Sequence, residues 1–263
     1  MNGDGELEIL GLPSFAAIPP ISPEPRGKER APVRPALSSP EPAVARASRE
    51  PAFHAVSRPA SALTGDFYLN LRRGDAWLFG LGDVAGHGID AAVYMMMIQE
   101  EIERLAGEDA LTLTALVAEL HATLRAELPG HRFATMVLAE LAPSGRMEIV
   151  NAGHCPPLLR RSDGEILALP PNGPILGPLP RSRWSSLGTR LRSGDTLLMV
   201  SDGVLEARAP DGEEFGAERL WTALGRDGGL EVPALVGALL DEVARFRRGA
   251  PPADDTSIVA IRG

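Results

Sequence analysis

The chain has 263 residues, of which 44% are hydrophobic and 23% charged, with a formal net charge of −9. This composition is typical of a soluble globular protein, and the acidic balance argues against nucleic acid or an anionic membrane as the main partner. No apolar run approaches the roughly 20 residues that span a bilayer, and the first residues lack a secretory signal. Cys155 is the only cysteine, so no intrachain disulfide can form. We therefore expect a cytoplasmic protein.

Residues 1–51 are expected to form a disordered arm. Prolines recur from Pro13 to Pro42 among Ser, Ala, Arg and Glu, with few large apolar residues. Such a segment buries too little apolar surface to offset the entropy lost on ordering. A docking peptide is the alternative for this arm. From residue 52 the pattern becomes that of a packed domain, which we expect to span residues 52–263.

Two strands and two helices are predicted at the start of this domain. Residues 67–71 and 77–81 read as strands on either side of the turn at 73–75. Apolar residues then recur at helical spacing at Val93, Met97, Ile98, Ile102 and Leu105. A second helix carries Leu113, Leu116, Val117, Leu120 and Leu124 on one face and ends before Pro129-Gly130.

A run of strands follows, with the hairpin-type turn signals Ser144-Gly145 and Asp163-Gly164 between them. The strands are expected at 133–141, 147–153, 157–161, 165–169, 184–192 and 195–200. Helices are predicted around 217–225 and 233–247, and a last strand at 256–262. The short gaps between strands favour antiparallel pairing, because parallel pairs need a crossover of a dozen or more residues. The pattern therefore predicts an α+β layered sandwich.

Aspartates recur at the ends of the predicted strands. They are Asp66, Asp83, Asp202, Asp254 and Asp255. Hard cations such as Mg²⁺ and Mn²⁺ take oxygen ligands, and carboxylates gathered without a cation would raise one another's pKa values. Each aspartate also has a simpler interpretation: Asp-Gly is a common turn dipeptide, so Asp202-Gly203 alone would be an ordinary turn.

Seven motifs occur in order and are more specific together than any one alone. They are GDFY (65–68), GDVAGHG (82–88), FATM (133–136), NAGHCPP (151–157), GDTLLMVSDGVLEA (194–207), GEEFG (212–216) and DDTSIV (254–259). In this combination the domain resembles the bacterial metal-dependent PP2C-like protein phosphatases, in their stress-response and sporulation (SpoIIE- and RsbU-type) branch. The resemblance implies a four-layer αββα sandwich of two antiparallel sheets flanked by helix pairs.

The resemblance also implies a centre of two divalent cations, Mn²⁺ or Mg²⁺. Asp83 matches the carboxylate that bridges both ions, and Val84 matches a backbone carbonyl ligand. Asp66 matches the acidic residue serving one ion, and Asp202 and Asp254 match the ligands of the other. Asp83 and Asp66 are therefore the candidate catalytic residues. The implied reaction is direct hydrolysis of phosphoserine or phosphothreonine in a protein, without a phosphoenzyme intermediate.

Supporting roles are expected for four neighbours of these ligands. Asp255 lies beside Asp254, and Gly86 and Gly203 give the backbone room for tight turns. His87 is either a neighbour of the phosphate or an ordinary turn histidine. Asp90 is expected to cap the helix that follows.

The chain departs from the family pattern at three positions. Thr64 stands where relatives commonly have a glycine, and Leu69 where they have a further acidic residue. Cys155 replaces the Asn that commonly follows the NAGH motif. Within that motif, His154 has either a structural role or a role in ordering the loop near the site. All four principal metal aspartates are present, which favours an active enzyme.

The resemblance implies a small phosphorylated anti-sigma-factor antagonist as substrate. Regulation is expected to come from a partner, from dimerisation through the helices or from the proline-rich arm. The main alternative is a catalytically weak or inactive relative that regulates by binding a phosphoprotein. A metallophosphoesterase acting on small molecules or nucleic acid is also chemically feasible, although the acidic balance disfavours nucleic acid. A dinucleotide site at Gly80, Gly82 and Gly86 is disfavoured, because Asp83 would repel a pyrophosphate. Residues 170–183 are either a specificity loop or a plain connection.

Overall fold

The computed structural model describes residues 50–86, 88–108, 110–130 and 132–263. The arm expected over residues 1–51 lies outside these ranges apart from its last two residues. His87, a candidate supporting residue, also lies outside the described residues.

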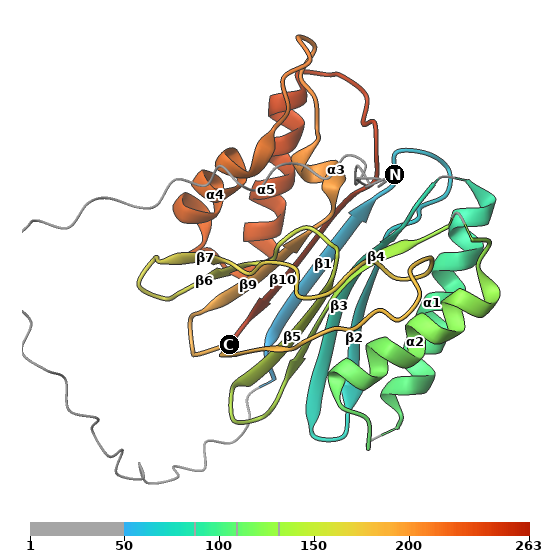
Figure 1. Cartoon of the computed structure of the whole chain (residues 1–263). Helices are drawn as coiled ribbons and strands as arrows, with labels where there is room; N and C mark the ends of the chain where they lie inside the picture. Colours follow the sequence, from blue (N-terminus) through green and yellow to red (C-terminus); the bar gives the residue numbers. More distant parts are fainter. Residues whose placement is uncertain (1–49, 87, 109, 131) are drawn as a thin grey trace, which may run out of the picture. The chain divides into compact units, whose positions relative to one another are not determined.

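The described residues form two antiparallel sheets of five strands each (Figure 1). The first sheet has the order β2 (Phe67–Arg73), β3 (Ala76–Val84), β4 (Ala134–Leu141), β5 (Arg146–Ala152) and β8 (Leu187–Arg190). The second has the order β1 (Ala52–Arg58), β10 (Thr256–Arg262), β9 (Thr196–Val200), β6 (Leu158–Arg160) and β7 (Ile166–Ala168). Among the described residues, the first strand, β1, thus pairs with the last, β10.

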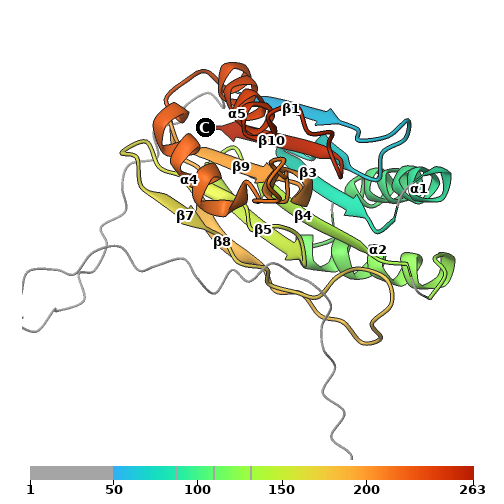
Figure 2. The same cartoon turned by 90° about the horizontal axis from the view of Figure 1, so that it is seen from above.

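Helix pairs cover the two outer faces of the sandwich (Figure 2). Helices α1 (Ile89–Ala106) and α2 (Leu113–Glu127) pack on the first sheet. Helices α4 (Gly216–Asp227) and α5 (Val232–Arg247) pack on the second, where the short α3 (Asp202–Leu205) follows β9. The predicted α+β sandwich with four layers is confirmed.

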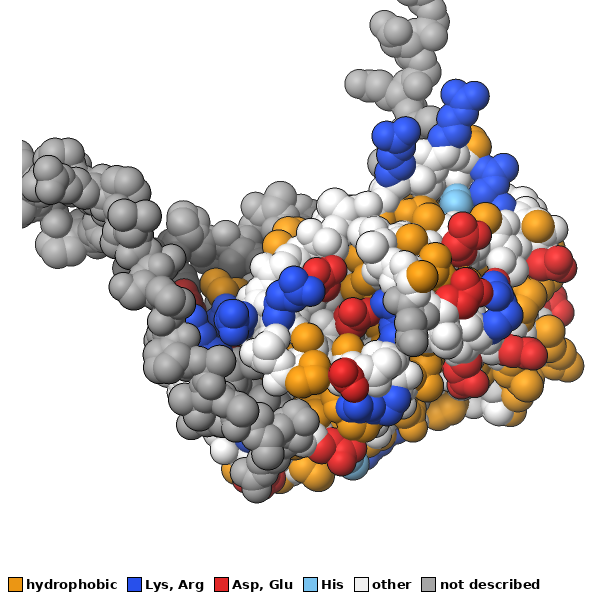
Figure 3. All heavy atoms as spheres, turned by 90° about the horizontal axis from the view of Figure 1, so that it is seen from below, with side chains coloured by type: hydrophobic (Ala, Val, Ile, Leu, Met, Phe, Trp, Pro, Cys, Tyr) orange, Lys and Arg blue, Asp and Glu red, His pale blue; other side chains and the backbone are white. Residues whose placement is uncertain are grey.

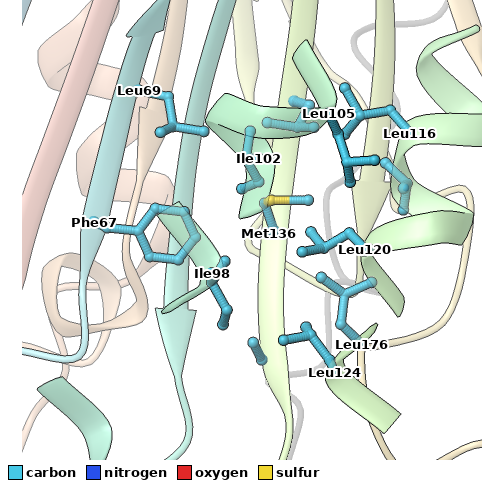
Figure 4. Packing of buried hydrophobic residues seen from close by; sticks show 14 of the residues in the cluster. Phe67, Leu69, Ile98, Ile102, Leu105, Leu116, Leu120, Leu124, Met136 and Leu176 are labelled. Atoms are coloured by element: carbon cyan, nitrogen blue, oxygen red, sulfur yellow. The ribbon is translucent and has the colours of Figure 1, made fainter. Parts of the chain in front are cut away.

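Three apolar layers hold the sandwich together. Under α1 and α2, Phe67, Ile98, Met136 and Leu120 belong to one buried cluster (Figure 4). Strand β10 shows how the layers share one strand: Val259 and Ile261 pack between the sheets, whereas Ile258 and Ala260 face α4 and α5. Because alternate residues of a strand point to opposite faces, a strand buried on both faces reads as a continuous apolar run.

The sequence predictions failed at three places in the fold. Strand β1 was missed, because AFHAVSR lacks both a continuous apolar run and a clear alternation. The four-residue helix α3 was also missed. Val93, expected on the buried face of α1, is 56% exposed. It lies five residues before the buried Ile98, which places it about 140° away around the helix.

Asp195, in the turn before β9, is a buried anchor that is 1% exposed. Its carboxylate accepts hydrogen bonds from Arg161 Nη1 at 2.8 Å, Ser162 N at 3.0 Å and Arg192 N at 3.1 Å. We expect Asp195→Ala to lower the free energy of unfolding by about 3 kcal/mol, because the N–H groups of Ser162 and Arg192 lose their acceptor and Arg161 loses its carboxylate partner. Chemical denaturation would measure this, with the exposed Asp163→Ala as control; equal stability of the two variants would contradict the prediction.

The described surface shows mixed charge on the face seen in Figure 3. Acidic and basic side chains lie there among hydrophobic ones. Among the described residues, no helix combines the length and the apolar content needed to cross a membrane.

Candidate metal centre

The aspartates singled out in the sequence lie close enough to change one another's ionisation. Burial raises the pKa of Asp66 to about 8, and the charge of Asp83 contributes. Burial also raises the pKa of Asp83 to about 7, with further contributions from Asp202, Asp254 and Asp255. Burial and the charge of Asp254 raise the pKa of Asp202. Without a compensating cation, part of this cluster therefore holds protons near neutral pH.

One oxygen of the cluster is buried without a partner. Asp66 is 4% exposed, and its Oδ2 forms no hydrogen bond. An anionic oxygen in this position is costly unless a proton or a cation compensates it. Carboxylate and carbonyl oxygens are the ligands that Mg²⁺ and Mn²⁺ prefer. The chemistry of the donor set therefore fits divalent cations.

The side chains do not by themselves enclose an ion. Across the described residues, no group of three Asp, Glu, His or Cys side chains converges closely enough to hold one. Mg²⁺ usually keeps several of its waters and binds through only one or two carboxylates. A cation here would accordingly need water in its coordination sphere or some inward movement of the carboxylates.

Asp83 and Val84 end β3 against the loop that leads to Asp66. Val84 N donates a hydrogen bond to Gly65 O at 3.3 Å. A Cβ atom at Gly65 would lie 2.9 Å from Val84 O and 3.1 Å from Asp83 Oδ1. Glycine at position 65 therefore lets the two segments approach, and the carbonyl of Val84 faces the Asp66 loop.

The turn after β3 is held by an arginine that sequence reasoning missed. Gly86 has a φ of +107°, and a Cβ atom there would lie 2.0 Å from Arg132 Nη1. Arg132 donates to Ala85 O at 2.8 Å and pairs with Asp90 at 3.5 Å. Gly88, not Asp90, is the N-cap of α1, so the predicted capping is wrong; Asp90 lies in the first turn, where a carboxylate is favoured as expected.

The NAGH motif forms a buried turn behind the candidate site. Asn151 accepts from His154 N at 2.8 Å through its side-chain oxygen. His154 Nδ1 lies 2.8 Å from Thr135 Oγ1, and Thr135 is the cross-strand partner of Asp83. Burial lowers the pKa of His154 to about 4, so the ring is neutral at physiological pH. These contacts agree with a structural role for His154.

The candidate specificity loop at 170–183 is anchored to α2. Gly177 N donates to His121 Nδ1 at 3.2 Å, and His121 Nε2 lies 3.0 Å from Leu179 O. Trp184 packs edge-on against His121 and donates to Pro174 O at 2.8 Å. This segment is thus a fixed part of the surface beside α2.

A family model described as Stage II sporulation protein E (SpoIIE) matches residues 73–263. The chain belongs to the SpoIIE family. This family is the sporulation and stress-response branch of the PP2C-like phosphatases, as the motifs predicted. Asp66 precedes the matched range, so its place in the site rests on the motif order and on the contacts described above.

Two curated relatives show how much of the chain is shared. Protein IcfG of Synechocystis is 26% identical over 239 residues, which cover 80% of this chain and 37% of that protein. Phosphoserine phosphatase RsbU of Bacillus subtilis is 27% identical over 160 residues, which cover 60% of this chain and 48% of that protein. The chain thus spans less than half the length of these relatives.

Solved structures of PP2C domains share the fold. The SiaA-PP2C domain of Pseudomonas aeruginosa has a TM-score of 0.73 and 21% identity, covering 80% of this chain and 85% of that one. The PP2C domain of SpoIIE from Bacillus subtilis, solved with a fragment of its regulatory domain, has a TM-score of 0.70 and 19% identity. That match covers 82% of this chain and 64% of the other.

Proposed function

We propose that this SpoIIE-family chain hydrolyses phosphoserine or phosphothreonine in a protein with the help of two divalent cations, Mn²⁺ or Mg²⁺. The proposed ligands are Asp66, Asp83, Val84, Asp202 and Asp254. The observation that carries the proposal is the cluster of buried carboxylates with mutually raised pKa values. Family membership supports the same class of reaction.

The carboxylates of the cluster have different roles in the proposed site. Asp83 couples electrostatically to Asp66 as well as to Asp202 and Asp254, so it is the carboxylate suited to serve both ions. Asp66 supplies the buried oxygen that lacks a partner. Divalent cations bound here would offset the charge of the phosphate group and make hydroxide available at neutral pH.

The protonation state of Cys155, whose thiol lies near these carboxylates, also agrees with direct attack by water. Burial raises the pKa of Cys155, and the charge of Asp202 raises it further. The thiol therefore stays protonated and is a poor nucleophile. This disfavours a covalent intermediate at Cys155 and leaves hydrolysis by an activated water as the simpler route.

We further propose that the substrate is a phosphorylated anti-sigma-factor antagonist. The motif resemblance and the similarity to the phosphoserine phosphatases RsbU and RsbP of Bacillus subtilis support this choice. The alternative is a weak or inactive relative that binds a phosphoprotein without hydrolysing it. Such a relative would be expected to have lost a metal aspartate, whereas all four candidate aspartates are present in this chain.

The test is an assay of the whole chain on p-nitrophenyl phosphate and on a phosphoserine peptide, with Mn²⁺, with Mg²⁺ and with EDTA. We expect hydrolysis that depends on the cation and stops with EDTA. Calorimetric titration with Mn²⁺ separates the alternatives. Binding of Mn²⁺ without hydrolysis of either substrate would favour the inactive relative, and the absence of both would overturn the proposed metal centre.

A further inference from the structure

The carboxylate of Asp255 is turned toward the loop that precedes Asp66. Its Oδ1 accepts a hydrogen bond from Ala60 N at 2.7 Å. Its Oδ2 accepts from Gly65 N at 3.0 Å and from the hydroxyl of Thr64 at 2.6 Å. All three donors belong to one short segment, although about 190 residues of sequence separate it from Asp255. Asp255 is only 8% exposed, so water competes little for these bonds.

The hydroxyl of Thr64 connects the carboxylate of Asp255 to the backbone of Asp66 through two hydrogen bonds. A hydroxyl has one proton to donate, and the short contact with the Asp255 carboxylate uses it. The same oxygen then accepts a hydrogen bond from Asp66 N at 3.0 Å. A directed chain therefore runs from the backbone of Asp66 through Thr64 to the charge of Asp255.

The backbone of Asp255 contacts the other segments that carry proposed ligands. Ser201 Oγ donates to Asp255 O at 3.1 Å, and a Cβ atom at Gly203 would lie 2.0 Å from that same oxygen. Asp255 N donates to Asp254 Oδ1 at 2.8 Å. One residue thus joins the segments that bear Asp66, Asp202 and Asp254.

We propose that Thr64 and Asp255 are a positioning pair that holds Asp66 in place for cation binding, an inference that rests on the function proposed above. Without the hydroxyl, Asp255 loses its shortest hydrogen bond and Asp66 N loses its acceptor. The unpartnered oxygen of Asp66 would then no longer be fixed relative to Asp83. Outer-sphere partners of this kind commonly change metal affinity 10- to 100-fold.

The test measures Mn²⁺ affinity by calorimetry on folded protein, so that it does not depend on turnover. Thr64→Val removes the hydroxyl at nearly constant volume and is expected to weaken Mn²⁺ binding by about tenfold or more. Thr64→Ser keeps the hydroxyl and is expected to stay within about threefold of the unaltered chain. Thr222→Val makes the same change on the exposed side of α4 and serves as control. Thr64→Ala replaces Thr64→Val if that variant does not fold.

The pairing itself is tested with Asp255→Asn. Because both residues act through one chain of hydrogen bonds, the double variant should lose little more affinity than the more affected single variant. Additive losses would overturn the pairing. Unchanged Mn²⁺ affinity of Thr64→Val with a lowered melting temperature would also overturn it, since the hydroxyl would then only stabilise the fold. If the unaltered chain binds no Mn²⁺, the proposed function falls and this inference falls with it.

Discussion

Replacement of Asp83 by Asn is expected to lower Mn²⁺-dependent hydrolysis of p-nitrophenyl phosphate by about 10³-fold or more. The substitution keeps the shape of the side chain and removes the charge that couples to Asp66 and to Asp202. The fold should remain intact, because loss of this charge relieves repulsion within the cluster. Initial rates at saturating Mn²⁺, together with circular dichroism, would measure both effects.

Asp75→Asn is the matched control for this experiment. Asp75 lies exposed in the turn between β2 and β3, so the same chemical change there should leave the rate unaltered. Asp202→Asn should follow Asp83→Asn in direction, since its carboxylate belongs to the same cluster. Full activity of a folded Asp83→Asn variant would show that the site has been assigned to the wrong residues.

Gly203→Ala is expected to destabilise the fold by roughly 3 kcal/mol or more and to abolish Mn²⁺ binding. The added Cβ atom would lie 2.0 Å from Asp255 O and 2.9 Å from Asp255 C, and both atoms belong to the backbone. No rotamer change can relieve that contact, so α3 and the segment of Asp255 must move apart. Thermal unfolding and Mn²⁺ titration would follow the two consequences separately.

Gly237→Ala in α5 provides the comparison. A Cβ atom at Gly237 would meet nothing within 4 Å, and alanine favours the helix, so a gain of roughly 0.5–1 kcal/mol is expected. A Gly203→Ala protein that melts at the temperature of the unaltered chain and binds Mn²⁺ normally would refute the close packing of these two segments.

The fold was largely predictable because the central strands β3, β4, β9 and β10 are buried on both faces and therefore form apolar runs. The hairpin turns at Gly145 and Gly164, both with positive φ, were also marked by their sequences. Strand β1 was not predicted, because its extended conformation depends on pairing with β10 rather than on a pattern in its own residues. The order of strands within each sheet likewise depends on contacts between distant segments, which periodicity does not reveal.

In the candidate site, too, local sequence patterns were predictable and contacts between distant segments were not. The aspartates stood out because each follows an apolar run or precedes one, and their order matched a family. The contacts that orient them gave no local signal: Thr64 bonds Asp255 across 191 positions, and Arg132 bonds Ala85 across 47. Thr64 was noticed only as a departure from the family pattern. Its hydrogen bonds to Asp255 and Asp66 became visible only in the folded chain.

The pairing of β1 with β10 has a consequence for how the molecule forms. Ala52 pairs with Arg262, so β1 cannot take its place in the second sheet until β10, about 200 residues later in the chain, has been made. Pairings between such distant segments slow folding, since the entropy of closing the loop is lost before the contacts form. Until β10 forms, β1 and β9 lack their shared partner strand, and their unpaired backbone groups can pair with other chains and lead to aggregation. The segment of Asp255 directly precedes β10, so a nascent chain would complete the proposed cation site and the second sheet in the same late step.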